Sequence, residues 1–169
     1  ERGFELKIQG GLIRYISFVV LGLADAVVEI AGIHAGSLGI YNSTRLAGLA
    51  GIIAGAAASI AMSSAAFAQA KQGFQGSPRL SAIYTGVSYF AAALILASPY
   101  FFTESMTFAL GLSLFLAVLL VAFIVFYSAV ISGKPFTRDF LEITGIMFGA
   151  TFVLYVLGTL IRHFFGITI

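Results

Sequence analysis

The segment LGLADAVVEIAGIHAG, residues 21–36, places Asp25 and Glu29 inside an otherwise apolar stretch of the chain. An acidic side chain near the centre of a membrane-spanning helix costs about 2.5–3.5 kcal/mol on insertion scales. Two such side chains in one span therefore indicate a functional role. Residues four apart lie on one face of a helix. We therefore expect both carboxylates to face other helices rather than lipid.

No lysine or arginine lies at a comparable depth in the chain, so Asp25 and Glu29 have no permanent counter-charge that the sequence reveals. A bound cation would supply one. Because metal binding displaces protons from carboxyl groups, such a site would couple metal movement to proton movement. The simpler interpretation is that the two acids pair with hydroxyl groups in a packed bundle or point into water.

The composition is that of an integral membrane protein. Of the 169 residues, 60% are hydrophobic and 9% are charged, and the mean hydropathy is +1.04. The absence of cysteine excludes disulfides, cysteine metal sites and thiol nucleophiles. A net charge of +2, with few basic residues, does not favour nucleic-acid binding. No nucleophile–base pair, phosphate loop or redox-cofactor motif occurs at usable spacing, so we do not expect an enzyme.

Five apolar segments separated by polar turns are each long enough to cross about 30 Å of hydrocarbon as a helix. The fold class predicted is an all-α integral membrane protein, with residues 1–10 as an amphipathic lead-in at the cytoplasmic surface and residues 11–169 as the transmembrane domain. The spans are expected at about 11–33, 46–70, 80–102, 105–133 and 140–161. The chain begins at Glu1, which a processed N-terminus, a truncation or a preceding soluble domain would each explain.

The basic residues predict the orientation in the membrane. With the N-terminus in the cytoplasm, seven of the nine lysines and arginines lie on the cytoplasmic side, and Arg45 and Arg162 lie outside. Five spans then place the C-terminus outside. His34 and His163 fall at span ends on this outer side, where we expect them at the interface rather than as metal ligands.

Small residues in the first two spans predict close helix packing. The second span carries no charge, and one of its faces is a stripe of small residues at four-residue spacing: Ala47, Gly51, Gly55, Ser59 and Ser63. The first span ends with a similar pair, Gly32 and Gly36. Small residues at such spacing let two helix backbones approach closely.

Met62 is the single long side chain on the neighbouring stripe of alanines. A methionine in that setting fills a gap more often than it binds a ligand. Together with the first-span carboxylates, however, its thioether makes a mixed set that suits iron(II) or manganese better than magnesium or calcium. Asp139 and Glu142, at the start of the fifth span, either complement the helix dipole or form a cytoplasmic site where the ion arrives.

The first two spans resemble those of the vacuolar iron transporter family in its prokaryotic form. The family has an acidic pattern that Asp25-Ala26 and Glu29 match, and a small-residue run into methionine that residues 58–62, ASIAM, match. Two positions depart from the family. Ala61 stands where the family has serine, and Ala66-Phe67 stands where it has a Glu-Tyr pair, so one expected acidic ligand is missing.

The resemblance implies a homodimer of five-span subunits in a prokaryotic cell membrane, with the first two helices near the interface. Such a protein moves iron(II), and often manganese, out of the cytoplasm in exchange for protons along a path lined by Asp25 and Met62. The metal is cargo, and no tightly bound cofactor is implied. The alternative is a non-transporting membrane interaction or assembly protein, in which Asp25 and Glu29 bind a partner helix.

Overall fold

The computed structural model describes the backbone from residue 2 to residue 167 and the side chains from residue 13 onward. Every regular element in this part of the chain is a helix: α1 (Arg2–Ile40), α2 (Thr44–Ala70), α3 (Pro78–Ala97), α4 (Pro99–Phe102), α5 (Met106–Ser132) and α6 (Phe136–Phe165). Five helical segments are long and apolar enough to cross a membrane: Ile13–Ile40, Thr44–Ala70, Pro78–Phe102, Met106–Ser132 and Phe136–Phe165. The prediction of an all-α, multi-pass membrane protein is confirmed at this level.

The first helix differs most from its predicted bounds. Residues 2–10 are the first turns of α1 and continue into the span that begins at Ile13, and α1 ends at Ile40 rather than near Ile33. Glycines at its end do not break it, although glycine is a weak helix former, because α6 packs tightly over them. The last helix also begins early, at Phe136 rather than near Phe140, because Pro135 already occupies its N-cap position.

Serine side chains cap three of the spans. The hydroxyl groups of Ser43, Ser77 and Ser105 each accept a hydrogen bond from the backbone N–H three residues later, which satisfies one of the free donors at a helix start. Pro78 follows Ser77 at the first helical position, where its missing N–H costs nothing. The α2–α3 and α4–α5 turns are therefore set by local sequence.

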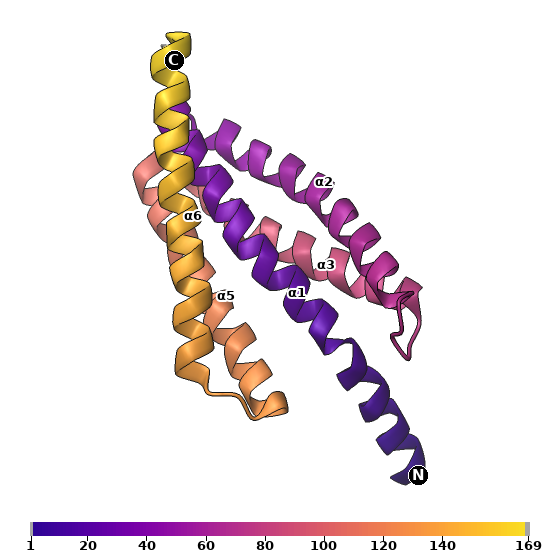
Figure 1. Cartoon of the computed structure of the whole chain (residues 1–169). Coiled ribbons are helices and arrows are strands. Elements are labelled where there is room, and N and C mark those ends of the chain that lie inside the picture. The colour runs from indigo at the N-terminus through magenta and orange to yellow at the C-terminus, as the bar shows by residue number, and fades with distance from the viewer. Residues whose placement is uncertain (1, 168–169) are drawn as a thin grey trace.

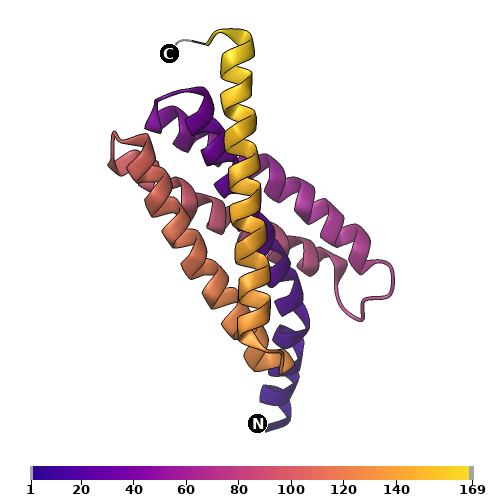
Figure 2. The ribbon, with the colours of Figure 1, turned by 60° about the vertical axis from the view of Figure 1, so that its left-hand side comes forward.

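Helix α1 is the centre of the bundle. It packs most extensively against α6 and α3, while α2 packs against α3. In Figures 1 and 2 the α2–α3 hairpin and the α5–α6 hairpin lie on different sides of α1, and the two ends of the chain lie at opposite ends of the molecule. The main hydrophobic core joins α1, α3, α5 and α6, with Ile30, Tyr89, Leu96, Val121 and Met147 among its buried members.

The outer faces of α5 and α6 carry large apolar side chains. Phe115, Phe126 and Phe152 are each more than half exposed, together with many aliphatic neighbours. An apolar surface of this extent is typical of helices that face lipid. Because α5 and α6 face lipid and α1 lies at the centre of the bundle, α1 is the span best placed to carry buried polar groups.

Candidate functional site

Glu29 is held by a tyrosine from another span. The Tyr89 hydroxyl of α3 donates a hydrogen bond of 2.6 Å to Oε2 of Glu29. Tyr89 is fully buried, whereas Glu29 is exposed on the single chain. A hydroxyl bound to a carboxylate at this distance forms one of the stronger hydrogen bonds in proteins. Helix α3 therefore fixes the carboxylate of Glu29 while leaving it accessible.

Asp25 lies one turn earlier on α1 and is half-buried. Residues four apart lie on the same face of a helix, so Asp25 and Glu29 neighbour one another on α1. The only ion pair among residues 13–167 joins Arg138 to Glu142. Neither Asp25 nor Glu29 therefore has a basic partner in this part of the chain. The arrangement of two carboxylates and one phenol is therefore suited to a cation.

Met62 faces the same part of the bundle. Its half-buried side chain packs against the core cluster that contains Ile30 and Tyr89, so α2 brings the thioether toward the α1–α3 contact. Ala66, one turn further on, is fully buried in a different cluster with Phe18 and the partly buried Phe74. The position where the resembling family has an acid is thus closed by aromatic packing in this chain.

The described side chains do not close a complete metal site. No three histidine, aspartate or glutamate side chains come together within residues 13–167. Two carboxylates are fewer ligands than a divalent ion takes in a protein site. The exposed side of Glu29 leaves room for further ligands.

Asp139 and Glu142 line a separate hollow of about 300 Å³ at the start of α6, together with Val20 of α1 and Ser128 of α5. Arg138 pairs with Glu142 at 2.9 Å, and both side chains are largely exposed. Glu29, by contrast, turns toward α3. The structure therefore does not bring the two acidic pairs together.

His34 is buried rather than interfacial, which corrects the expectation from the sequence. Its ring is fully buried, packs at a tilt against Tyr100 of α4 with 4.2 Å between centroids, and lies against Gly51 of α2. The reason is the length of α1. Because the helix continues to Ile40, His34 lies within the bundle and not at its end.

The predicted packing residues lie at close helix contacts within one chain. Gly32 and Gly36 face Leu154 of α6, Gly51 faces His34, and Gly55 faces Ala93 of α3; the backbone of Ser59 lies against Gly86 of α3. A β-carbon at Gly51 would collide with the His34 ring. These small residues let α1 approach α6 and α2, and let α2 approach α3.

No family model matches the chain, and no curated protein matches it. The functional argument therefore depends on the chemistry of the side chains that the fold brings together.

Sequence reasoning did not select Tyr89 as a site residue. A tyrosine in an apolar span is usually a packing residue, and only the α1–α3 contact shows that its hydroxyl reaches Glu29. The one signal in the sequence is that a buried phenol needs a hydrogen-bond partner.

Tyr89→Phe is expected to weaken the binding of a divalent cation at Asp25 and Glu29 at least about tenfold, because a hydrogen bond to a charged group contributes about 1.5–3 kcal/mol. The measurement is metal binding to the purified protein as a function of metal concentration. Tyr155→Phe, on the exposed side of α6, is the matched control and should leave the curve unchanged. Equal shifts in the two variants would show that Tyr89 has no specific role in the site.

Proposed function

We propose that this chain is a subunit of a membrane transporter of the vacuolar iron transporter type, which exchanges iron(II) or manganese for protons. The observation that carries the proposal is the pair Asp25 and Glu29 on the central helix, without an ion-pair partner among residues 13–167. Tyr89 holds Glu29 in place. Leaving two carboxylates without a counter-charge inside a membrane domain is costly, and a transported cation supplies that charge.

Proton exchange follows from the same groups. Carboxylates must lose their protons before they bind a metal, so each binding event at Asp25 and Glu29 releases protons and each metal departure takes them up. The excess of basic residues on the N-terminal side favours a cytoplasmic N-terminus. We take the direction from the family that the chain resembles: metal leaves the cytoplasm as protons enter.

A homodimer supports this function better than a single chain. Glu29 is exposed, and the described residues of one chain supply no third acidic or histidine ligand. A second copy whose α1 and α2 lie across from this face would bring its own Asp25, Glu29 and Met62 to the path. Asp139 and Glu142 form the cytoplasmic site where the ion first arrives.

The exposed carboxylate of Glu29 also favours a second candidate function. A membrane interaction or assembly protein could use Asp25 and Glu29 to bind a partner helix that carries an intramembrane lysine or arginine. The family that the chain resembles has an acid at the position of Ala66. In this chain Ala66 is buried among aromatic rings, so that acid is missing, as expected of a protein that has lost transport.

The test is flux into proteoliposomes that contain a metal-sensing dye and a pH dye. Iron(II), manganese, cobalt and magnesium are supplied in turn to vesicles carrying the full chain. We expect iron(II) or manganese to move while protons move in the opposite direction, and magnesium to stay excluded. Absence of flux for every metal through folded protein would overturn transport and favour the interaction protein.

Met62→Leu is expected to lower iron(II) flux several-fold and to leave any residual magnesium flux unchanged. Leucine keeps the volume of the side chain but removes the sulfur, which binds iron(II) and not magnesium. The same dye assay measures both ions. An equal fall for both ions would show that Met62 acts by packing alone.

A further inference from the structure

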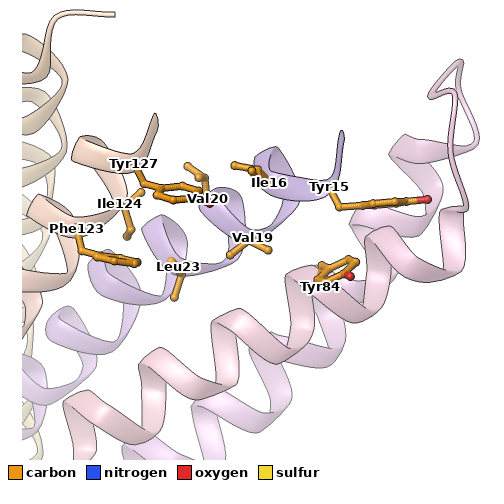
Figure 3. A pocket seen from close by; sticks show the side chains of 9 residues that line it. All are labelled: Tyr15, Ile16, Val19, Val20, Leu23, Tyr84, Phe123, Ile124 and Tyr127. Atoms are coloured by element: carbon orange, nitrogen blue, oxygen red, sulfur yellow. The ribbon is translucent and has the colours of Figure 1, made fainter. Parts of the chain in front are cut away.

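A hollow of about 280 Å³ opens between α1, α3 and α5 (Figure 3). Val19 and Leu23 of α1 lie between Phe123 and Tyr127 of α5 on one side and Tyr84 of α3 on the other. All nine lining residues are aliphatic or aromatic, and none is charged. The hollow is therefore suited to an apolar ligand.

The three helices place this hollow within a single leaflet. On α1 the lining ends at Leu23, about 15 Å from Ile13, where the span begins, at 1.5 Å per residue. On α5 it ends at Phe123, about 14 Å from Ser132, and on α3 Tyr84 lies about 9 Å from Pro78. Half of the hydrocarbon core is about 15 Å thick. The hollow thus covers the depth of the leaflet on the N-terminal side.

Three exposed basic residues belong to the same ends of the spans as the lining residues. Arg14 follows Ile13, where the first span begins, Arg79 lies in the first turn of α3, and Lys134 lies in the turn after α5. Arg14 donates to the backbone oxygen of Gln75, which leaves most of its five N–H donors free. Of the two acids at this end among residues 13–167, Glu142 pairs with Arg138. The other, Asp139, lines the neighbouring hollow between α1, α5 and α6. Basic residues at the ends of spans attract anionic lipid headgroups.

We propose that this hollow binds one acyl chain of an anionic phospholipid, with the headgroup at Arg14 and Arg79. Charge selects this occupant, because the exposed Arg14 and Arg79 match an anionic headgroup. A single hydrocarbon chain is the apolar component of a membrane narrow enough to enter. This inference does not depend on metal transport.

The chain contains no tryptophan, so one introduced tryptophan reports the local lipid. Phe123→Trp places it in the hollow, and Phe126→Trp is the matched control. Both positions lie on α5 and are similarly exposed, but Phe126 does not line the hollow. Each variant is reconstituted in phosphatidylcholine containing a fixed fraction of brominated phosphatidylglycerol or, separately, brominated phosphatidylcholine. Bromine quenches tryptophan fluorescence on contact.

We expect the Phe123→Trp chain to favour brominated phosphatidylglycerol about fivefold, the preference that one basic residue near an anionic lipid produces. The Phe126→Trp chain should respond equally to both lipids. Equal quenching by both headgroups in the two chains would overturn the anionic preference. Quenching of the Phe126→Trp chain alone would show that no acyl chain enters the hollow.

Adding Arg14→Gln together with Arg79→Gln should abolish the preference at position 123. Arg45→Gln, which changes an exposed arginine at the other end of the bundle, should not. Loss of the preference in both would indicate a general charge effect and overturn the site. If Phe123→Trp does not fold, Tyr127→Trp samples the same hollow. Because no metal is added, a failure of metal transport leaves the result unaffected.

Discussion

Asp25→Asn is expected to abolish metal flux, with a fall of at least about a hundredfold in the proteoliposome assay. Asparagine keeps the shape of the side chain but cannot carry the negative charge that binds a cation or release a proton when metal arrives. Losing one charged ligand from a partly buried site costs about 3 kcal/mol or more, which corresponds to that factor. Metal-driven proton movement should disappear together with the metal flux.

Folding should survive this change. A neutral side chain is less costly than a charged one inside a membrane, so thermal unfolding in detergent should occur at the same temperature or higher. Glu104→Gln is the matched control, because Glu104 is an exposed acid in the turn between α4 and α5 and its substitution also removes one negative charge. Unchanged flux with Asp25→Asn would contradict the metal site, whatever the control shows.

Gly158→Ala is expected to destabilise the protein by about 1–3 kcal/mol, as overpacking does in other tightly packed interiors. A β-carbon at Gly158 of α6 would collide with the backbone carbonyl of Gly36 on α1. Backbone atoms cannot rotate away as a flexible side chain can, so the two helices must separate. Because α1–α6 is the most extensive contact in the bundle, a local separation affects the whole fold.

The measurement is reversible unfolding in detergent or a thermal shift of the purified protein. Gly149→Ala is the matched control on the same helix, since nothing lies within 4 Å of a β-carbon built at Gly149. Alanine there should be neutral or slightly stabilising, because it is the better helix former. Equal effects at the two positions would show that α1 and α6 do not pack as closely as the structure indicates.

The number and type of the helices could be read from the sequence because both depend on local properties. Runs of more than twenty apolar residues between polar turns are recognisable one segment at a time. The pair Ser77-Pro78 predicted the start of α3 correctly. The end of α1 could not be read in this way. Its glycines weaken a helix locally, and only the packing of α6 over Gly36 and Gly39 explains why the helix continues to Ile40.

The candidate site likewise contains two residues that could be recognised in the sequence and one that could not. Asp25 and Glu29 were recognisable because charge in an apolar span is rare and costly, and their i, i+4 spacing puts them on one helical face. Their role in metal transport stays a prediction. The contribution of Tyr89 was not recognisable, because sixty positions separate it from Glu29 and many registers of α3 against α1 would be equally apolar.

The sequence by itself determined an all-helical membrane domain with five spans and two acids in the first. Only the tertiary structure decided that Tyr89 meets Glu29, that His34 is buried against Gly51, and that a hollow remains between α1, α3 and α5. The reason is that hydropathy drives a helix into the membrane without selecting which of its faces meets another helix. In lipid, that choice depends on close packing and on polar contacts between helices, which the order of residues along one span does not contain.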